Sequence, residues 1–227
     1  MIAGLSAVDL FAFAVFAIAW AGYSWFADRR FAEHGLMGAT ARHRIRWMEQ
    51  MLARENRIYD STLVANISRS PNFFAQTSLI ILGGLIAVIG AGERVSGLVA
   101  EVPFAQRTEA AAWHLKLGIE VIIFIYAFFK FTWSMRQFNY LMIVMGAAPP
   151  HGSDAARQEG RAVVARAARM SDIATENFNS GIRAYYFGLA ALGWFVHPLL
   201  LAAASALVVL VLWRREFHSR TLAALKD

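Results

Sequence analysis

The stretch FFAQTSLIILGGLIAVIGAG, residues 73–92, has no charged residue in 20 positions. An α-helix needs about 20 mainly apolar residues to cross a bilayer whose hydrocarbon core is roughly 30 Å thick. Stretches of comparable length and character occur at residues 5–27, 113–135 and 184–213. The sequence therefore predicts an all-α integral membrane bundle with four transmembrane helices, forming a single domain over residues 1–227.

The amino-acid composition supports a membrane location. Of the 227 residues, 58% are hydrophobic and 17% are charged, whereas soluble domains contain about 25% charged residues. A soluble domain of this size could not bury so many apolar side chains, because a large share of its residues lies at the surface. The chain has no cysteine, which excludes disulfide frameworks, iron–sulfur clusters, Cys-based zinc sites and Cys nucleophiles.

The fourth apolar stretch is interrupted by His197-Pro198. As one helix, residues 184–213 would be about 45 Å long, which exceeds the thickness of the bilayer core. A single tilted helix kinked at Pro198 and a tight hairpin of two half-spans both fit this pattern. We favour the kinked helix.

The distribution of basic residues predicts the topology. The net charge is +6, and residues 28–72 contain eight arginines while residues 136–183 contain six. Because cytoplasmic loops collect Lys and Arg, both segments are expected to be cytoplasmic, and four crossings then place both termini outside. No nucleic-acid-binding motif accompanies the positive charge, so no nucleic-acid partner is expected.

Both cytoplasmic segments are expected to be helical. From Thr40 to about residue 69, apolar residues recur at helical spacing and most arginines lie off that stripe. Such a basic amphipathic helix is predicted to pack on the inner face of the bundle, with anionic lipid headgroups as partners; a dedicated lipid- or partner-recognition site is the alternative. In the second segment, residues 153–182, Ser153 is a candidate helix cap, and the helix is expected to continue into the fourth span.

Several sequence motifs resemble those of a family of multi-pass membrane proteins of bacteria and plants that is known only as a domain of unknown function. The motifs cover nearly the whole chain: SPNFF at 70–74, AFFKFTWSMRQFNY at 127–140, FNSGIRAYYF at 178–187, WF and HP at 194–198, and REF at 215–217. The resemblance implies a multi-pass fold and a location in the bacterial inner membrane. It implies no activity and no catalytic residues.

Charged and polar residues inside the apolar stretches are the candidate functional residues, because ionisable groups are costly in a membrane and often mark functional sites. The helical periodicity predicts a polar seam between the third and fourth spans, formed by Glu120, Lys130, Arg183, Tyr186 and His197. Glu120 and His197 are expected at one depth. They either pair or line a cavity; alternatively, Glu120 pairs with Lys116 at i,i+4 and His197 binds a backbone carbonyl beside Pro198.

Two further groups of residues are expected at the helix ends and faces. A polar ring is predicted at the inner ends of the spans, from Asn72, Arg136, Asn139, Asn177 and Asn179. A small-residue face on the second span favours close helix packing within the chain or between subunits; it consists of Gly83, Gly84, Ala87 and Ala91.

The sequence predicts a binding or transport role rather than catalysis. The six histidines show no metal-binding spacing, and no nucleotide-binding or hydrolase motif is present, so neither a metal nor a cofactor is predicted. The leading hypothesis is a channel- or transporter-like homo-oligomer that uses the polar seam. The alternative is a non-catalytic scaffold or accessory subunit of a larger membrane complex.

Overall fold

The computed structural model describes residues 4–30, 35–101, 105 and 109–226. Within these residues the chain is almost entirely helical, which confirms the all-α prediction. The α-helices are α1 (Ala7–Trp25), α2 (Leu36–Ala53), α3 (Ile58–Ala100), α4 (Ala110–Gly146), α5 (Asp154–Ala191), α6 (Pro198–Phe217) and α7 (Arg220–Lys226). A π-helical turn η1 (Phe26–Arg30) extends α1, and a 3-10 turn η2 (Leu192–Phe195) follows α5.

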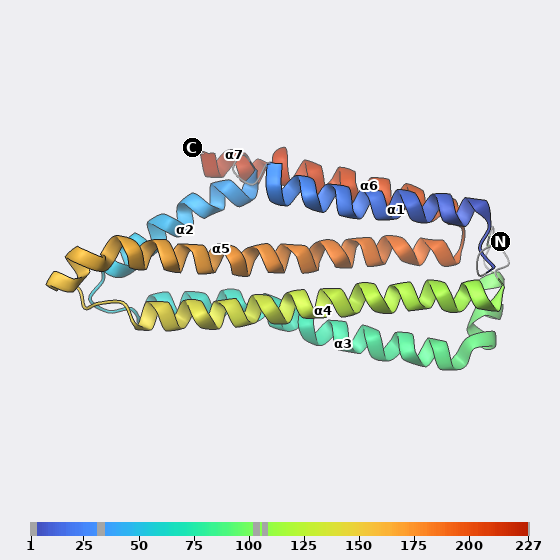
Figure 1. Ribbon diagram of the computed structural model, residues 1–227, viewed down its shortest axis with the longest axis horizontal. Helices are drawn as coiled ribbons and strands as arrows, with labels where there is room; N and C mark the ends of the chain where they lie inside the picture. Colours follow the sequence, from blue (N-terminus) through green and yellow to red (C-terminus); the bar gives the residue numbers. More distant parts are fainter. Residues whose placement is uncertain (1–3, 31–34, 102–104, 106–108, 227) are drawn as a thin grey trace.

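The helices form an elongated layered bundle (Figure 1). Helices α4 and α5 run antiparallel side by side along most of its length, and α3 packs along α4. Helix α3 also reaches α5, where Tyr185 donates to the Phe74 carbonyl at 3.1 Å. Helices α1 and α6 pack on each other and on the C-terminal half of α5, while α2 covers the N-terminal half of α5. The C-terminal half of α5 is therefore enclosed between α4 and the α1–α6 pair.

Helices of two length classes build the bundle. α1 and α6 have 19 and 20 residues, whereas α4 and α5 have 37 and 38. At a rise of about 1.5 Å per residue the longer pair extends for about 55 Å, nearly twice a bilayer core of about 30 Å. Among the described residues, three helical stretches are long and apolar enough to cross a membrane: Ala7–Asp28, Ile58–Gly92 and Pro198–Ala224.

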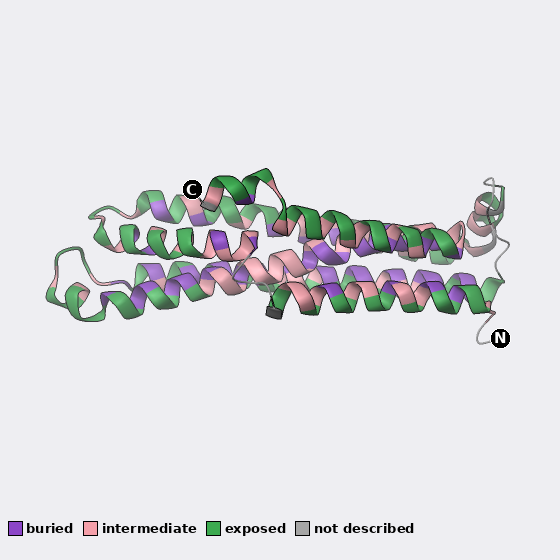
Figure 2. Ribbon diagram, turned by 90° about the horizontal axis from the view of Figure 1, so that it is seen from above, coloured by how far each residue is buried: buried purple, intermediate pink, exposed green. Residues whose placement is uncertain are grey.

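Two hydrophobic clusters lie along the bundle. Figure 2 shows that the buried residues lie on the sides of the helices that face one another. The larger cluster joins α1, α3, α4, α5 and α6, and its most buried large residues include Phe16, Phe131, Phe187, Trp194 and Leu201. The smaller cluster joins α2, α3, α4 and the N-terminal half of α5, and it includes Met48, Met51, Val64, Leu141 and Ala167. The long helices thus share one core with α1 and α6 and a second core with α2.

The predicted single kinked helix over residues 184–213 is wrong, because the chain reverses direction there. Helix α5 ends at Ala191, and α6 begins at Pro198 and returns antiparallel beside it. Proline has no N–H to donate and fixes φ near −65°, so it fits the first turn of a helix and forces the preceding residue into an extended conformation. His197 has that conformation, with φ −156° and ψ 138°. His197-Pro198 therefore starts a helix and does not kink one.

The boundary predicted between residues 40–69 and residues 73–92 is also misplaced. Helix α3 runs continuously through Pro71, and the break lies earlier, between α2 and α3. Tertiary contacts fix this break, since Arg57 donates to the carbonyls of Ala148 and Pro149 at 2.8 and 2.5 Å. The buried Asp60 carboxylate in the first turn of α3 accepts from Trp47 Nε1 at 2.7 Å and from Arg54. These partners come from outside α3, so the local pattern did not reveal them.

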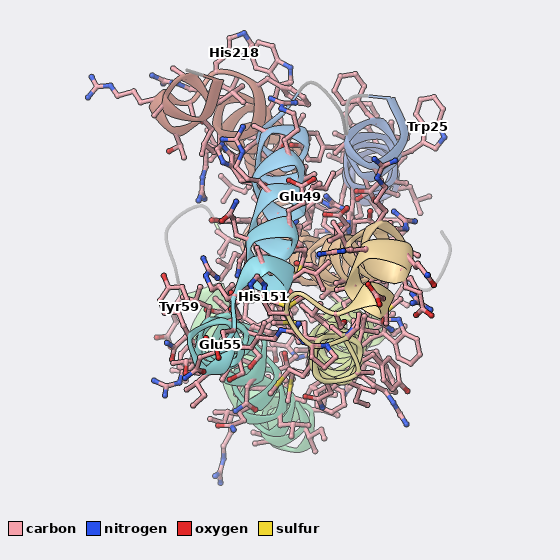
Figure 3. All side chains as sticks on the ribbon, turned by 90° about the vertical axis from the view of Figure 1, so that its left-hand side faces the viewer. Trp25, Glu49, Glu55, Tyr59, His151 and His218 are labelled. Atoms are coloured by element: carbon pink, nitrogen blue, oxygen red, sulfur yellow. The ribbon has the colours of Figure 1, made fainter. Side chains whose placement is uncertain are left out.

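The prediction for residues 153–182 agrees with the structure. The Ser153 hydroxyl accepts a hydrogen bond from the Ala156 amide at 3.1 Å and caps α5, which continues without a break to Ala191. The loop that precedes it lies at the end of the bundle where α2 meets α3. Figure 3 views the molecule from this end, where His151, Glu49, Glu55 and Tyr59 are exposed.

Candidate functional site

A buried polar cluster joins the start of α1 to α4 and to the turn after α5. Trp194 Nε1 donates to Asp9 Oδ1 at 2.7 Å, and Lys116 Nζ lies 3.3 Å from the same carboxylate oxygen. Lys116 also donates to the Trp194 carbonyl at 3.0 Å. Asp9 and Lys116 are 7% and 3% exposed, so each neutralises the other inside the bundle. The polar groups of the cluster bind one another, so the cluster holds the start of α1, α4 and the turn after α5 together.

Glu120 and His197 do not pair. Glu120 is 1% exposed, and neither of its carboxylate oxygens has a hydrogen-bond partner among the described residues. His197 Nδ1 accepts from the Leu199 amide at 3.1 Å and caps α6. The alternative pairing of Glu120 with Lys116 is not formed either, because Lys116 is bound to Asp9. His197 lies in the α5–α6 turn, and this explains why a prediction based on one continuous helix placed it wrongly.

Other members of the predicted seam do connect α4 to α5. Lys130 Nζ lies 3.3 Å from Asn177 Oδ1 and 5.6 Å from the centre of the Tyr126 ring. One turn further along α4, Ser134 donates to the Ala174 carbonyl at 2.7 Å. This part of the α4–α5 interface is held by direct hydrogen bonds between the two helices.

Arg183 and Tyr186 lie on a different side of α5, toward α1 and α6. Arg183 Nη2 donates to both carboxylate oxygens of Asp28 at 2.7 and 2.8 Å. Arg183 is 8% exposed, and its Nε has no hydrogen-bond partner among the described residues. Tyr186 accepts a 2.6 Å hydrogen bond from Arg215 Nη1. The predicted seam is thus divided between two sides of α5.

Arg183, Tyr186 and Arg215 line a cavity of about 410 Å³ between α1, η1, α2, α5, α6 and the start of α7, which we name the arginine pocket. Its size lies in the range of small-molecule sites, about 300–1,000 Å³. Six charged side chains line it: Arg44, Arg183, Arg215, Asp28, Glu176 and Glu216. Uncharged lining residues include Tyr23, Leu36, Met37, Asn179, Ile182 and Leu212.

Most charges in the arginine pocket already have partners. Arg44 Nε is 2.7 Å from Asp172 Oδ1, and Glu216 Oε1 accepts from the Met37 amide at 3.0 Å in the first turn of α2. An ideal Cβ at Gly35 would lie 2.6 Å from Glu216 Oε1 and 3.0 Å from the Phe217 ring, so a larger residue here would require these side chains to shift. The carboxylate of Glu216 is therefore stabilised by a helix N-terminus.

Glu176 is the least strongly paired acid of the pocket. Its carboxylate lies 3.6 Å from Arg169 Nη1, and both side chains are substantially exposed. Burial raises the pKa of the Glu176 carboxyl above its ordinary value, and Arg169 opposes this shift. Burial therefore favours the protonated form of the Glu176 carboxyl.

The predicted inner-face polar ring is spread over several surfaces. Asn72, Arg136 and Asn139 are exposed, and the first two bond to neighbours on their own helices, Gln76 and Tyr140. Asn177 contacts Lys130, whereas Asn179 lies near Met37 Sδ at 2.8 Å and lines the arginine pocket. The two asparagines of α5 thus have different surroundings, although they are two residues apart.

The small residues predicted to form a packing face on the second span have no neighbours within the chain. Gly83, Gly84, Ala87 and Ala91 are all exposed, and no atom lies within 4 Å of an ideal Cβ at either glycine. No residue from 79 to 92 is buried. This part of α3 therefore offers an apolar face that the rest of the described chain does not cover.

The sequence pattern did not indicate four residues of the buried cluster and the pocket: Asp9, Asp28, Arg44 and Glu216. Each binds a partner more than 120 positions away, so no local pattern could identify the pair. A signal was nonetheless present, because the motifs at 178–187 and 215–217 together supply Asn179, Arg183, Tyr186, Arg215 and Glu216 to the arginine pocket. The described residues hold no group of three or more metal-ligating side chains.

Comparison with known proteins identifies a family and nothing finer. No curated protein and no solved structure matches the chain. One family model, described as "Protein of unknown function, DUF599", matches residues 11–221, a range that includes all the residues that line the arginine pocket. The chain therefore belongs to this family of unknown function, DUF599.

Proposed function

We propose that the chain is a five-pass membrane protein that self-associates through α3 and serves as a non-catalytic scaffold or accessory subunit in the membrane. The proposed crossings are α1, residues 73–92 of α3, the N-terminal half of α4, the part of α5 from about residue 177 together with η2, and α6. These segments lie side by side in one half of the bundle (Figure 1). The other half, formed by α2 and the remaining parts of α3, α4 and α5, would project into the cytoplasm.

The charge distribution supports five crossings better than four. With the α5–α6 hairpin, the chain after Trp213 lies on the same side as residues 28–72 and 136–176. That side then holds 17 of the 22 Lys and Arg residues, as the positive-inside rule requires, and Arg183 lies near the inner end of the α5 crossing. The proposed topology has the N-terminus outside and the C-terminus inside, which replaces the earlier expectation of two outside termini. The exposed Arg42 and Arg46 of α2 would face anionic headgroups.

The observation that carries the scaffold proposal is the uncovered face of α3. Residues 79–92 contain no buried residue, whereas α1 and α6 each bury side chains against the bundle. Glycine and alanine four positions apart let two helix backbones approach closely, and lipid chains fill such a shallow face poorly. A second copy of the chain is the occupant we propose, because a face of this kind is self-complementary across a two-fold axis.

A second candidate function is transport through the α4–α5 seam of a homo-oligomer, and Glu120 favours it. A carboxylate buried in the proposed membrane region without a partner is unusual, because it costs free energy unless a proton or cation accompanies it. The other ionisable residues of the seam contact their own chain instead. Proteoliposomes that contain the protein and show a proton or cation flux, abolished by Glu120→Gln, would establish transport over the scaffold role.

Cysteine cross-linking tests the proposed self-association directly, because the chain has no cysteine of its own. We expect Gly84→Cys or Ala87→Cys to form disulfide-linked dimers in native membranes under mild oxidation. Leu207→Cys on α6, 58% exposed, is the matched control and should stay monomeric. Absence of cross-links on α3, or equal cross-linking at Leu207, would contradict the proposal.

A bulky residue on the same face provides an independent test. Gly84→Leu should shift the protein to a monomer in gentle detergent, as measured by light scattering, without loss of helicity. Gly22→Leu on α1 is the control, since neither glycine has an intrachain neighbour at its Cβ position. If the wild-type protein is itself a monomer, lipid covers the α3 face and the scaffold proposal is wrong.

A further inference from the structure

We propose that the arginine pocket is a binding site for a phosphate group, held between Arg215 and Arg183. This inference uses the membrane placement of the bundle but not the self-association of α3. Two guanidinium groups of the pocket keep N–H donors free when the internal contacts of the pocket have formed.

Arg215 is the first of these two groups. It donates Nη1 to the Tyr186 hydroxyl, and its guanidinium carbon lies 6.0 Å from the centre of the Tyr186 ring. No ion pair joins it to a carboxylate among the described residues. Tyr186 thus orients the guanidinium while leaving its charge and its other N–H groups available. Arginine in this state suits phosphate, because its planar donors match two phosphate oxygens.

Arg183 is the second group. Asp28 and Ser180 both accept from its Nη2, and its Nη1 makes no hydrogen bond among the described residues. The Nε is enclosed by the protein, so Nη1 is the donor that is left for a ligand oxygen in the cavity. The same side chain lines the cavity, so a guanidinium donor and the available volume coincide.

The carboxylates of the pocket do not oppose an anion as strongly as their number suggests. Asp28 is neutralised by Arg183, and Glu216 accepts from the α2 N-terminus. Arg44 is neutralised by Asp172, so it neither adds to nor removes the remaining charge. Glu176 lies beside Arg169. Arg215 is the lining arginine that has no ion pair among the described residues, so its guanidinium is the group that would meet a bound anion.

The level of the pocket in the bundle points to two sources of phosphate. The apolar part of α1 ends at Asp28 and the apolar part of α6 ends at Trp213, and both ends border the pocket. In the proposed topology this is the level of the inner-leaflet headgroups. Leu36, Ile182 and Leu212 add apolar lining surface. A phospholipid headgroup and a soluble phosphate ester therefore share the chemistry that the pocket recognises.

The first arm of the experiment tests the lipid source. The full-length protein is purified in mild detergent and native mass spectrometry measures retention of added phosphatidylglycerol, with phosphate-free digalactosyldiacylglycerol as the comparison lipid. The second arm tests the soluble source: glycerol 3-phosphate is titrated at constant ionic strength, and binding is measured from the shift in Tm. Whichever arm shows phosphate-dependent binding identifies the source.

Variants locate the binding. Arg215→Gln should weaken binding about tenfold or more, the effect of one lost charge-assisted hydrogen bond. Arg214→Gln is the matched control, since Arg214 is an exposed neighbour outside the lining of the pocket. The double variant Asp28→Asn, Arg183→Gln removes the second donor without leaving a single buried charge, and it should also lose binding. It serves as the test if Arg215→Gln does not fold.

The outcomes separate this inference from the proposed scaffold function. Loss of phosphate-dependent binding in Arg215→Gln, with α3 cross-linking unchanged, supports a phosphate site. If neither probe binds the wild-type protein, or if Arg214→Gln loses binding as much as Arg215→Gln does, there is no such site. Failure of α3 to cross-link would leave this inference unaffected.

Discussion

Trp194 donates its indole N–H to the carboxylate of Asp9 across 2.7 Å, although 185 positions separate the two residues in the chain. Asp9 also completes the cap of α1, where it accepts from the Ser6 amide and hydroxyl at 3.1 and 2.6 Å. One carboxylate thus begins the first helix and anchors the turn between α5 and α6. It also holds the buried Lys116, so three separate parts of the chain depend on it.

Asp9→Asn should destabilise the bundle strongly. The substitution leaves the Lys116 ammonium buried without a counter-charge, and breaking a buried ion pair in this way costs about 3–5 kcal/mol. Chemical unfolding in detergent, followed by circular dichroism, measures the change. Asp154→Asn, at a site whose side chain is 91% exposed, should change the free energy of unfolding very little. Full recovery is expected when Lys116→Met is added, and its absence would show that Asp9 acts mainly through the α1 cap.

Glu120→Leu should stabilise the protein. The wild-type carboxyl is 1% exposed with no partner among the described residues, and such a group costs about 1–3 kcal/mol. The free energy of unfolding should rise by an amount of this order, whereas Glu55→Leu at an exposed position should not raise it. A clear loss of stability in Glu120→Leu would mean that the carboxyl binds a water or cation, and it would strengthen the transport candidate.

Gly181→Ala should separate α4 from α5. An ideal Cβ at this position lies 2.6 Å from the Phe131 ring, which is itself fully buried. Overpacking of a well-packed core costs about 1–3 kcal/mol. Gly22→Ala, where no atom lies within 4 Å, should instead be neutral or stabilise α1 by about 0.5–1 kcal/mol, because alanine favours the helix. Equal Tm values for the two variants would contradict the close α4–α5 packing.

Glu176 should make stability depend on pH. Its pKa is raised in the folded protein by burial, so the folded state binds a proton more readily than the unfolded state does. Stability should therefore fall as pH rises through the window from the ordinary carboxyl pKa of 4.5 to the raised value. Tm measured across this window should fall less steeply in Glu176→Gln than in the wild-type protein. Identical slopes would exclude a role for Glu176.

Part of the fold could be predicted from local pattern. The apolar stretches at 5–27 and 73–92 and the cap at Ser153 correspond to helices, because helix formation depends on composition and on contacts within a few residues. Helix boundaries were harder to predict from local pattern. The α2–α3 break depends on Arg57 bound to Ala148 and Pro149, about 90 positions away. Pro71 also shows that a proline predicted at a helix start can lie inside a longer helix.

The candidate site was also only partly predictable from local pattern. Charges inside apolar stretches indicated Glu120, Lys130 and Arg183 correctly as buried or partly buried groups. Their partners could not be predicted, because the seam was drawn on a single helix running through His197-Pro198. Reversal of the chain at that point directs Arg183 toward Asp28 and Tyr186 toward Arg215.

The sequence by itself determined that this is an all-α chain with apolar helices fit for a membrane, because hydrophobicity and helical period are local properties of the residues. Only the tertiary structure decided that α5 and α6 form a hairpin, that Asp9 binds both Lys116 and Trp194, and that six helical elements line the arginine pocket. Ion pairs and pockets depend on distances between residues far apart in the chain. Those distances exist only when the helices have packed.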